Sequence, residues 1–223
     1  MVKKFLLIVA VFLIVPTNVF GKTYKVTNSG FEVFFDEQIW DVFALNKLIN
    51  VELLEKYDSD NEDMQNYLNE NSMYIYAIYN GEEIFEFAVR YSSEIVNDKR
   101  ISYDQLGAAI AEQRGADNYE IYKNKYNYVK LEYYEPVYNM YLIEYHIIIN
   151  SQYYLFTAQK EIQFSEDEKS AIKEVIDSVE FHENTKKAFK FQIDWMDIIE
   201  YGISSTVSIS VIYFFLEKMK KYK

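Results

Sequence analysis

The stretch VYNMYLIEYHIII, residues 137–149, decides the fold that we predict for this chain of 223 residues. In an extended strand, alternate side chains point to opposite faces. One face would carry Val137, Tyr141, Ile143, Tyr145 and Ile147, and the other Tyr138, Met140, Leu142 and Ile148. Both faces are mostly apolar, whereas a strand with one solvated face alternates apolar and polar residues. The stretch therefore predicts an α+β fold, an antiparallel sheet with helices on both faces (α/β/α sandwich).

Turn residues on either side of this stretch predict the neighbouring strands. Asn80-Gly81 is a strong hairpin signal between residues 74–79 and 84–90. Three further pairs follow the same pattern: 137–149 with 152–158, 120–122 with 126–134, and 24–27 with 31–35. We expect one antiparallel sheet of about five to seven strands.

Three helices are predicted by a Ser followed three residues later by Glu or Gln, the pattern of a capping box. The pairs are Ser59 with Glu62, Ser102 with Gln105, and Ser165 with Glu168. The second helix would end at Gly115, because glycine is the usual residue after a helix C-terminus.

The two ends of the chain predict export and a membrane anchor. Lys3 and Lys4, an apolar run over 5–15 and small residues up to Gly21 indicate a cleaved signal peptide at 1–21. An uncleaved anchor is the alternative, but this run is shorter than the roughly 20 residues that a bilayer span needs. Cleavage would leave an extracytoplasmic domain at 22–182, followed by a linker at 183–197.

Residues 198–216 carry Glu200 as their single charge and precede a Lys-rich tail at 217–223. We predict a transmembrane helix with the tail on the cytoplasmic side, so that the chain crosses the cell membrane once. The alternative is a β-strand over 206–211. Small residues recur on one helix face at Gly202, Thr206 and Ser210, a pattern that favours helix–helix association.

Composition excludes several classes of partner and chemistry. The chain has a formal net charge of −12 and no cysteine, which argues against nucleic acid as a partner and rules out disulfides and thiolate chemistry. It contains two histidines, His146 and His182, and no H-E-x-x-H or G-x-S-x-G motif. We therefore expect no catalytic, cofactor-binding or metal-binding residues.

Three weaker signals leave alternatives open. Glu132 and Glu144 would serve a hydrolase if they met across two strands. The acidic residues Asp58, Asp60, Glu62 and Asp63 resemble a calcium loop, but the positions that such a loop needs as Gly and Glu are Asp63 and Asn69. We therefore favour helix capping as their role. Many of the 22 tyrosines fall in predicted strands, where they fill a core or, alternatively, form an aromatic binding surface.

Two segments resemble the PsbP/Mog1-like α/β/α sandwich. They are FEVFFDEQIW at 31–40, a strand and turn that lead to Trp40, and IDSVEF at 176–181, which closes the last helix. The usual proline before the Trp is replaced by Asp36. The resemblance spans residues 23–182 and implies a binding or assembly module. We accordingly expect a membrane-tethered, extracytoplasmic, non-catalytic module that binds a protein or cell-envelope component. An exported hydrolase and an accessory subunit of a membrane complex are the alternatives.

Overall fold

The computed structural model describes residues 21–26, 30–92, 102–150 and 152–182, and they form two antiparallel sheets with helices. The large sheet has seven strands in the order β3-β4-β5-β9-β8-β7-β6. Its strands are β3 (Trp40–Ala44), β4 (Met73–Asn80), β5 (Ile84–Tyr91), β6 (Glu120–Lys123), β7 (Asn127–Glu135), β8 (Met140–Ile149) and β9 (Gln152–Lys160). The small sheet has the order β1-β2-β10, with β1 (Gly21–Lys25), β2 (Phe31–Asp36) and β10 (Glu180–Phe181).

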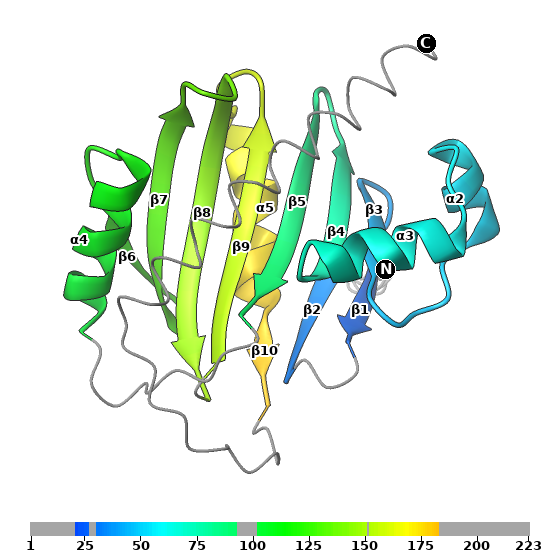
Figure 1. Ribbon diagram of the computed structural model, residues 1–223, viewed down its shortest axis with the longest axis horizontal. Helices are drawn as coiled ribbons and strands as arrows, with labels where there is room; N and C mark the ends of the chain where they lie inside the picture. The colour runs from blue at the N-terminus through cyan, green and yellow to red at the C-terminus, as the bar shows by residue number, and fades with distance from the viewer. Residues whose placement is uncertain (1–20, 27–29, 93–101, 151, 183–223) are drawn as a thin grey trace, which may run out of the picture.

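Both faces of the large sheet are covered, as the apolar pattern predicted (Figure 1). Helix α5 (Glu166–Ser178) and the small sheet lie behind one face, and α3 (Asn61–Glu70) and α4 (Tyr103–Arg114) lie over the other. Consecutive residues of β9 point to these two faces. Phe156 packs in the cluster that includes α5, and Leu155 packs against α4. The short helix α2 (Val51–Lys56) precedes α3.

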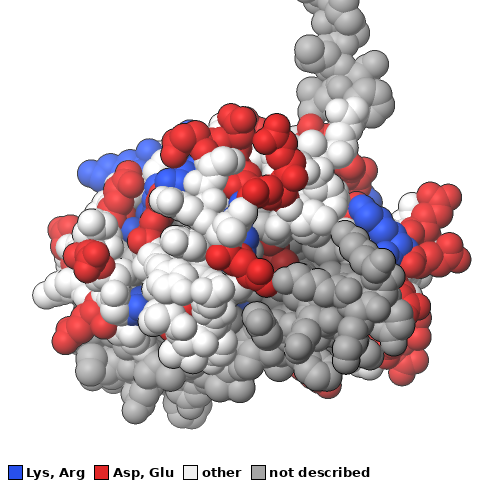
Figure 2. Space-filling model, turned by 90° about the horizontal axis from the view of Figure 1, so that it is seen from above, with Lys and Arg blue, Asp and Glu red and all other residues white. Residues whose placement is uncertain are grey.

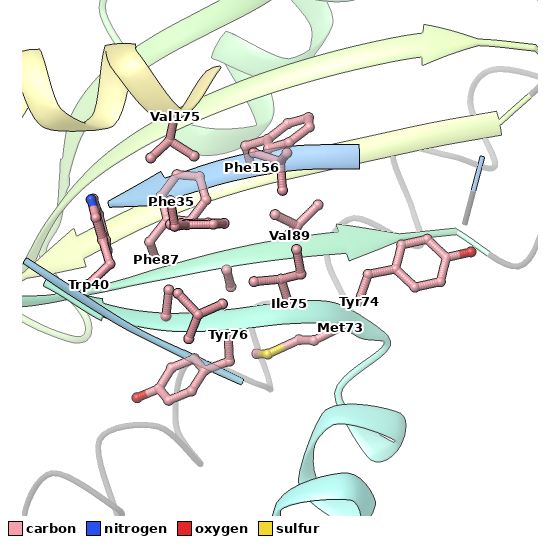
Figure 3. Packing of buried hydrophobic residues seen from close by; sticks show 14 of the residues in the cluster. Phe35, Trp40, Met73, Tyr74, Ile75, Tyr76, Phe87, Val89, Phe156 and Val175 are labelled. Carbon is pink, nitrogen blue, oxygen red and sulfur yellow. The ribbon is translucent and has the colours of Figure 1, made fainter. Parts of the chain in front are cut away.

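The main core lies between the large sheet, the small sheet and α5 (Figure 3). Phe35 of β2 and Phe87 of β5 both pack against Trp40, whose ring centroid lies 5.5 Å from that of Phe35 and 5.8 Å from that of Phe87. Such edge-to-face contacts add to the stabilisation from the buried area itself. This aromatic layer fixes the small sheet against the large one.

The predicted helix starts agree with the structure to within one residue. Ser165 forms the predicted capping box with Glu168 at the start of α5. Ser102 occupies the N-cap of α4 but makes no side-chain capping bond, and the helix ends at Gly115 with φ of 64°. The cap of α3 is Asp60 and not Ser59, because the Asp60 carboxylate accepts the hydrogen bond from the amide of Asp63.

The strand predictions were right in type and wrong in three details. β8 begins at Met140, because residues 136–139 form the turn after β7 and Asn139 has a positive φ of 56°. The predicted hairpin at 24–27 and 31–35 exists but belongs to a separate sheet, and not to one continuous sheet. The sequence analysis also missed β3, β10 and α2.

The predicted signal peptide, linker, transmembrane helix and basic tail lie outside the described residues, apart from Gly21, which begins β1. Within the part of the chain that the structure describes, no helix is long and apolar enough to cross a membrane.

Candidate functional site

One end of the large sheet brings together three turns that are far apart in the sequence. The β4–β5 turn follows Asn80, another turn joins β7 to β8, and β9 ends at Lys160. The register of these strands places all three at the same end, the upper end in Figure 1. We call the exposed residues of 81–84, 134–139 and 161–167 the strand-end surface.

Large apolar side chains are exposed on this strand-end surface. Val137 is 78% exposed, and Ile84, Ile162 and Tyr134 are 56%, 51% and 44% exposed. Single exposed apolar residues are ordinary, but several at one place mark interaction sites. Elsewhere in the described residues, the exposed large apolar side chains are Leu48 and Val51. The exposed apolar groups are therefore concentrated at this end of the sheet.

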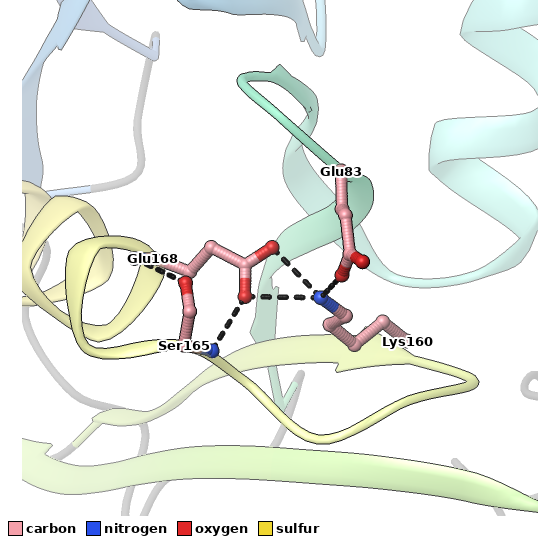
Figure 4. Close-up of polar contacts among 4 residues, drawn as sticks. All are labelled: Glu83, Lys160, Ser165 and Glu168. Atoms are coloured by element: carbon pink, nitrogen blue, oxygen red, sulfur yellow. Dashed lines mark hydrogen bonds and ion pairs between the residues drawn. The ribbon is translucent and has the colours of Figure 1, made fainter.

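A buried ion-pair network supports this surface from below (Figure 4). The ammonium of Lys160, whose side chain is 3% exposed, lies 2.7 and 2.9 Å from the two carboxylate oxygens of Glu168 and also contacts Glu83. Glu168 accepts a further hydrogen bond from the amide of Ser165 at the start of α5. The network ties β9, the β4–β5 turn and α5 together, and it neutralises the lysine.

The charge that remains on the strand-end surface is negative. Its carboxylates include Glu82, Glu161, Glu166 and Asp167. Nearby Lys169 is held by Glu132 at 2.9 Å and by Glu166 at 3.6 Å. Figure 2 looks down on this end and shows several red acidic groups, with fewer blue basic groups, among uncharged atoms. The surface thus combines exposed apolar side chains with acidic ones.

Comparison with known proteins adds no function. No protein-family model matches the sequence, and no curated protein matches it. Among solved structures, the chain is similar to cyanobacterial PsbP (CyanoP) from Synechocystis sp. PCC 6803, with a TM-score of 0.44 and 11% identity. The match covers 75% of this chain and 96% of that chain. The chain thus bears a weak, fold-level resemblance to PsbP.

His146 is packed and paired on the face covered by α4, as expected for a histidine in a strand. Its Nδ1 lies 2.6 Å from the hydroxyl of Tyr153, and its Nε2 lies 3.1 Å from Oε2 of Glu144. Arg114, the last residue of α4, donates to the same carboxylate oxygen across 3.1 Å. Burial lowers the pKa of His146, which favours the neutral imidazole, and the tautomer with its proton on Nε2 would donate to Glu144.

Glu132 and Glu144, the pair suggested for acid–base chemistry, lie on opposite faces of the sheet. Glu144 pairs with Leu131 in the strand register, so its neighbour Glu132 points the other way. Glu132 binds Lys130 and Lys169, whereas Glu144 binds Arg114. This geometry rules out the two carboxylates as a catalytic pair. The other histidine, His182, pairs with neither of these glutamates. Its Nε2 lies 3.3 Å from a carboxylate oxygen of Glu32.

The acidic residues at 58–63 lie at the start of α3, and Asp60 is its N-cap. Asp60 accepts the amide hydrogen bond that starts α3, and Glu62 and Asp63 occupy the first turn, where negative charge is favourable. No group of three metal-binding side chains occurs among the described residues. The helix-capping interpretation of this acidic cluster thus has direct structural support.

A polar hollow on the large sheet escaped the sequence analysis. It lies on the face covered by α3 and α4 and is lined by Ala88 and five polar residues: Tyr76, Glu86, Arg90, Thr157 and Gln159. Gln159 donates a hydrogen bond of 2.9 Å to Glu86. Burial raises the pKa of Glu86 from its ordinary value of 4.5 to about 7. The sequence did carry a signal for these buried polar residues. In β5, Glu86 and Arg90 alternate with apolar residues that pack on the opposite face of the sheet, namely Phe85, Phe87 and Val89.

The tyrosines serve mainly as core residues. Those at 74, 76, 79, 128, 145, 153 and 154 are buried. Tyr134, at the strand-end surface, is exposed and packs against Tyr141 with ring centroids 5.0 Å apart. The alternative of an aromatic binding surface therefore applies to few of them.

Proposed function

We propose that this chain is a membrane-tethered, extracytoplasmic and non-catalytic module that binds a protein or cell-envelope component through the strand-end surface. The observation that carries the proposal is the exposed apolar side chains of Val137, Ile84 and Ile162 at one end of the large sheet, in turns that also carry acidic residues. A partner that fits would present apolar side chains surrounded by Lys or Arg. Burial of apolar area would supply affinity, and the opposite charges would speed association and fix orientation.

The site is well suited to binding because its support is rigid. The turns are held by seven-stranded sheet pairing and by the Lys160 network, so that little ordering is needed when a partner binds. The tether is the part of the proposal that rests on sequence alone. Residues 1–21 would direct export, and residues 198–216 would hold the domain at the membrane.

Two finer proposals concern the tether. Gly202, Thr206 and Ser210 would allow close contact with a second transmembrane helix, since small residues let helix backbones approach. Such a contact would make the chain an accessory subunit of a membrane complex, with the strand-end surface as the second point of attachment. Both contacts together would raise the effective affinity through proximity.

Site-specific photo-cross-linking in intact cells tests the binding surface. A benzophenone amino acid at Val137 is expected to give a discrete adduct, because this side chain would lie inside the contact. The matched control is the same amino acid at Leu48, which is 90% exposed and lies outside the strand-end surface. We expect the Val137 adduct to weaken when Glu82 and Glu161 are replaced by Gln, and to weaken at high salt.

Equal yields of the same adduct at the two positions would show non-specific contact, and absence of an adduct at Val137 would show that this surface is free. Either result would overturn the proposed binding surface.

A further inference from the structure

His146 lies between a tyrosine hydroxyl and a carboxylate that it shares with Arg114. Its Nδ1 is 2.6 Å from the hydroxyl of Tyr153, and its Nε2 is 3.1 Å from Oε2 of Glu144. The guanidinium of Arg114 donates to that same oxygen, and the Arg114 and Glu144 side chains are 5% and 2% exposed. A neutral imidazole satisfies this arrangement, because it accepts a hydrogen bond at one nitrogen and donates one at the other.

A second proton on His146 does not fit these contacts. A protonated imidazole donates at both nitrogens, so the hydroxyl of Tyr153 would have to accept, and its own proton would lose the acceptor that it has on Nδ1. The imidazolium would also compete with the guanidinium of Arg114 for one oxygen of Glu144. Buried groups that lose a hydrogen-bond partner, or part of their ion pairing, destabilise the folded state. Acid would therefore weaken the contact between β8 and α4.

Two guanidinium groups already lie on this buried face of the sheet. Arg90 pairs with Leu155 in the strand register and Leu155 pairs with His146, which places Arg90 in the same row as the imidazole. Burial raises the pKa of Glu86, which lines the polar hollow together with Arg90, to about 7, so this carboxyl is mostly protonated in mild acid.

Few carboxylates remain to balance a charged imidazole. Among the described residues, the titratable and charged groups that face His146 are Arg90 and Glu86 of β5, Tyr133 of β7, Glu144 of β8, Tyr153 of β9 and Arg114 of α4. Once Glu86 is protonated, Glu144 is the ionised carboxylate that serves both guanidinium groups. A charged imidazole would be a third cation among them, at a place where charge is costly.

Helix α4 is attached to the domain separately from the main core. It lies at one side of the large sheet, over β6 and β7 (Figure 1). Its apolar residues, Leu106 among them, pack in a small cluster with β7, β8 and β9, whereas α5 packs in the main cluster. Polar contacts fasten both of its ends: Tyr103 donates to the carbonyl of Ile148 across 3.2 Å, and Arg114 binds Glu144. The helix can thus leave the sheet while the main core stays in place.

We propose that His146 is an acid-sensitive latch for helix α4, whose protonation weakens the contact of Arg114 with Glu144 and releases α4 from the sheet while the main core remains folded. Release would uncover Leu131 and Leu155, which are buried beneath the helix. The latch does not depend on the strand-end surface, so either proposal can fail without the other.

The pH range of the latch follows from the titration of His146. Burial outweighs the attraction of Glu144 and lowers the pKa of the imidazole from its ordinary value of 6.5. Because folding lowers this pKa, the closed state has its full stability above pH 6.5 and loses it as pH falls below that value. Opening takes up at most one proton at His146, so the opening equilibrium constant rises by at most about tenfold for each pH unit.

Hydrogen exchange of the full chain in detergent, measured by mass spectrometry between pH 7.5 and 5.5, tests the latch. After correction for the intrinsic pH dependence of amide exchange, the protection of α4 is expected to fall several-fold, up to about tenfold, by pH 5.5. The protection of α5 should stay constant over the same range. Constant protection of α4, or an equal loss of protection in α5, would overturn the proposal.

Variants identify the group that titrates. His146→Gln retains a donor for Glu144 and takes up no proton in this range, so the protection of α4 should no longer depend on pH; His146→Asn is a second neutral replacement. His182→Gln is the matched control, since it removes the other histidine, which is partly exposed beside Glu32, and should behave as wild type does. Near-UV circular dichroism checks that each variant is folded. A pH dependence that persists in a folded His146 variant, or that disappears in His182→Gln, would assign the titration to another group and overturn the proposal.

Discussion

The variant Arg114→Met is expected to lose about 3 to 5 kcal/mol of unfolding free energy, because it leaves Glu144 as a buried charge without its partner. The two side chains are 5% and 2% exposed, and the guanidinium holds the pKa of Glu144 down to about 2 against the effect of burial. Since this pKa is lowered by folding, Glu144 stabilises the protein above its ordinary pKa and the effect is lost as pH falls towards 2. The pair also fastens the end of α4 to β8.

Chemical denaturation of the full chain in detergent, followed by near-UV circular dichroism, measures this loss. The double variant Arg114→Met with Glu144→Gln should recover part of the stability, because the isolated charge is gone. Lys25→Met serves as the control, since it removes a lysine from an exposed ion pair with Glu32 and should change stability little. A single variant Arg114→Met as stable as the control would contradict the role of the buried pair.

The variant Glu86→Gln is expected to be more stable than wild type at pH 8 and to change little at pH 4.5. Burial raises the folded-state pKa of Glu86 to about 7, so its contribution is most favourable below pH 4.5 and is lost as pH rises through 7. The loss amounts to about 3 kcal/mol, which Gln avoids while still accepting the hydrogen bond from Gln159. The same denaturation measurements, repeated from pH 4.5 to 8, give this dependence.

Glu82→Gln is the matched control, because Glu82 is an exposed residue in the β4–β5 turn. It should leave the pH dependence of stability unchanged between pH 4.5 and 8. If Glu86→Gln behaved as this control does, Glu86 would be ionised in the folded protein without cost, and burial would not control its titration.

Local signals allowed the hairpins and helices to be predicted. Asn80-Gly81, Gly115 and the Ser165 capping box each specify their structure through neighbouring residues, and the structure contains all three. The apolar pattern of 140–149 correctly predicted coverage of both faces. Short elements were missed because few residues carry their pattern, as in the five residues of β3 and the two of β10.

The arrangement of distant residues could not be predicted in this way. Phe31 of β2 pairs with Phe181 of β10, and the small sheet that they form follows from packing over the whole chain. Arg114 and Glu144 meet because α4 packs on β7, which no local pattern indicates. Likewise, the acidic turns were visible in the sequence, but their position at one end of the sheet depends on the strand order.

Labelling of single cysteines tests most directly whether the domain is tethered outside the membrane. The chain has no cysteine, so Leu48→Cys and Lys221→Cys each introduce one thiol, the first on the exposed surface of the folded domain. With a membrane-impermeant maleimide, we expect Leu48→Cys to be labelled in intact cells and Lys221→Cys to be labelled only after lysis. Labelling of Leu48→Cys only after lysis, or of Lys221→Cys in intact cells, would contradict the proposed topology.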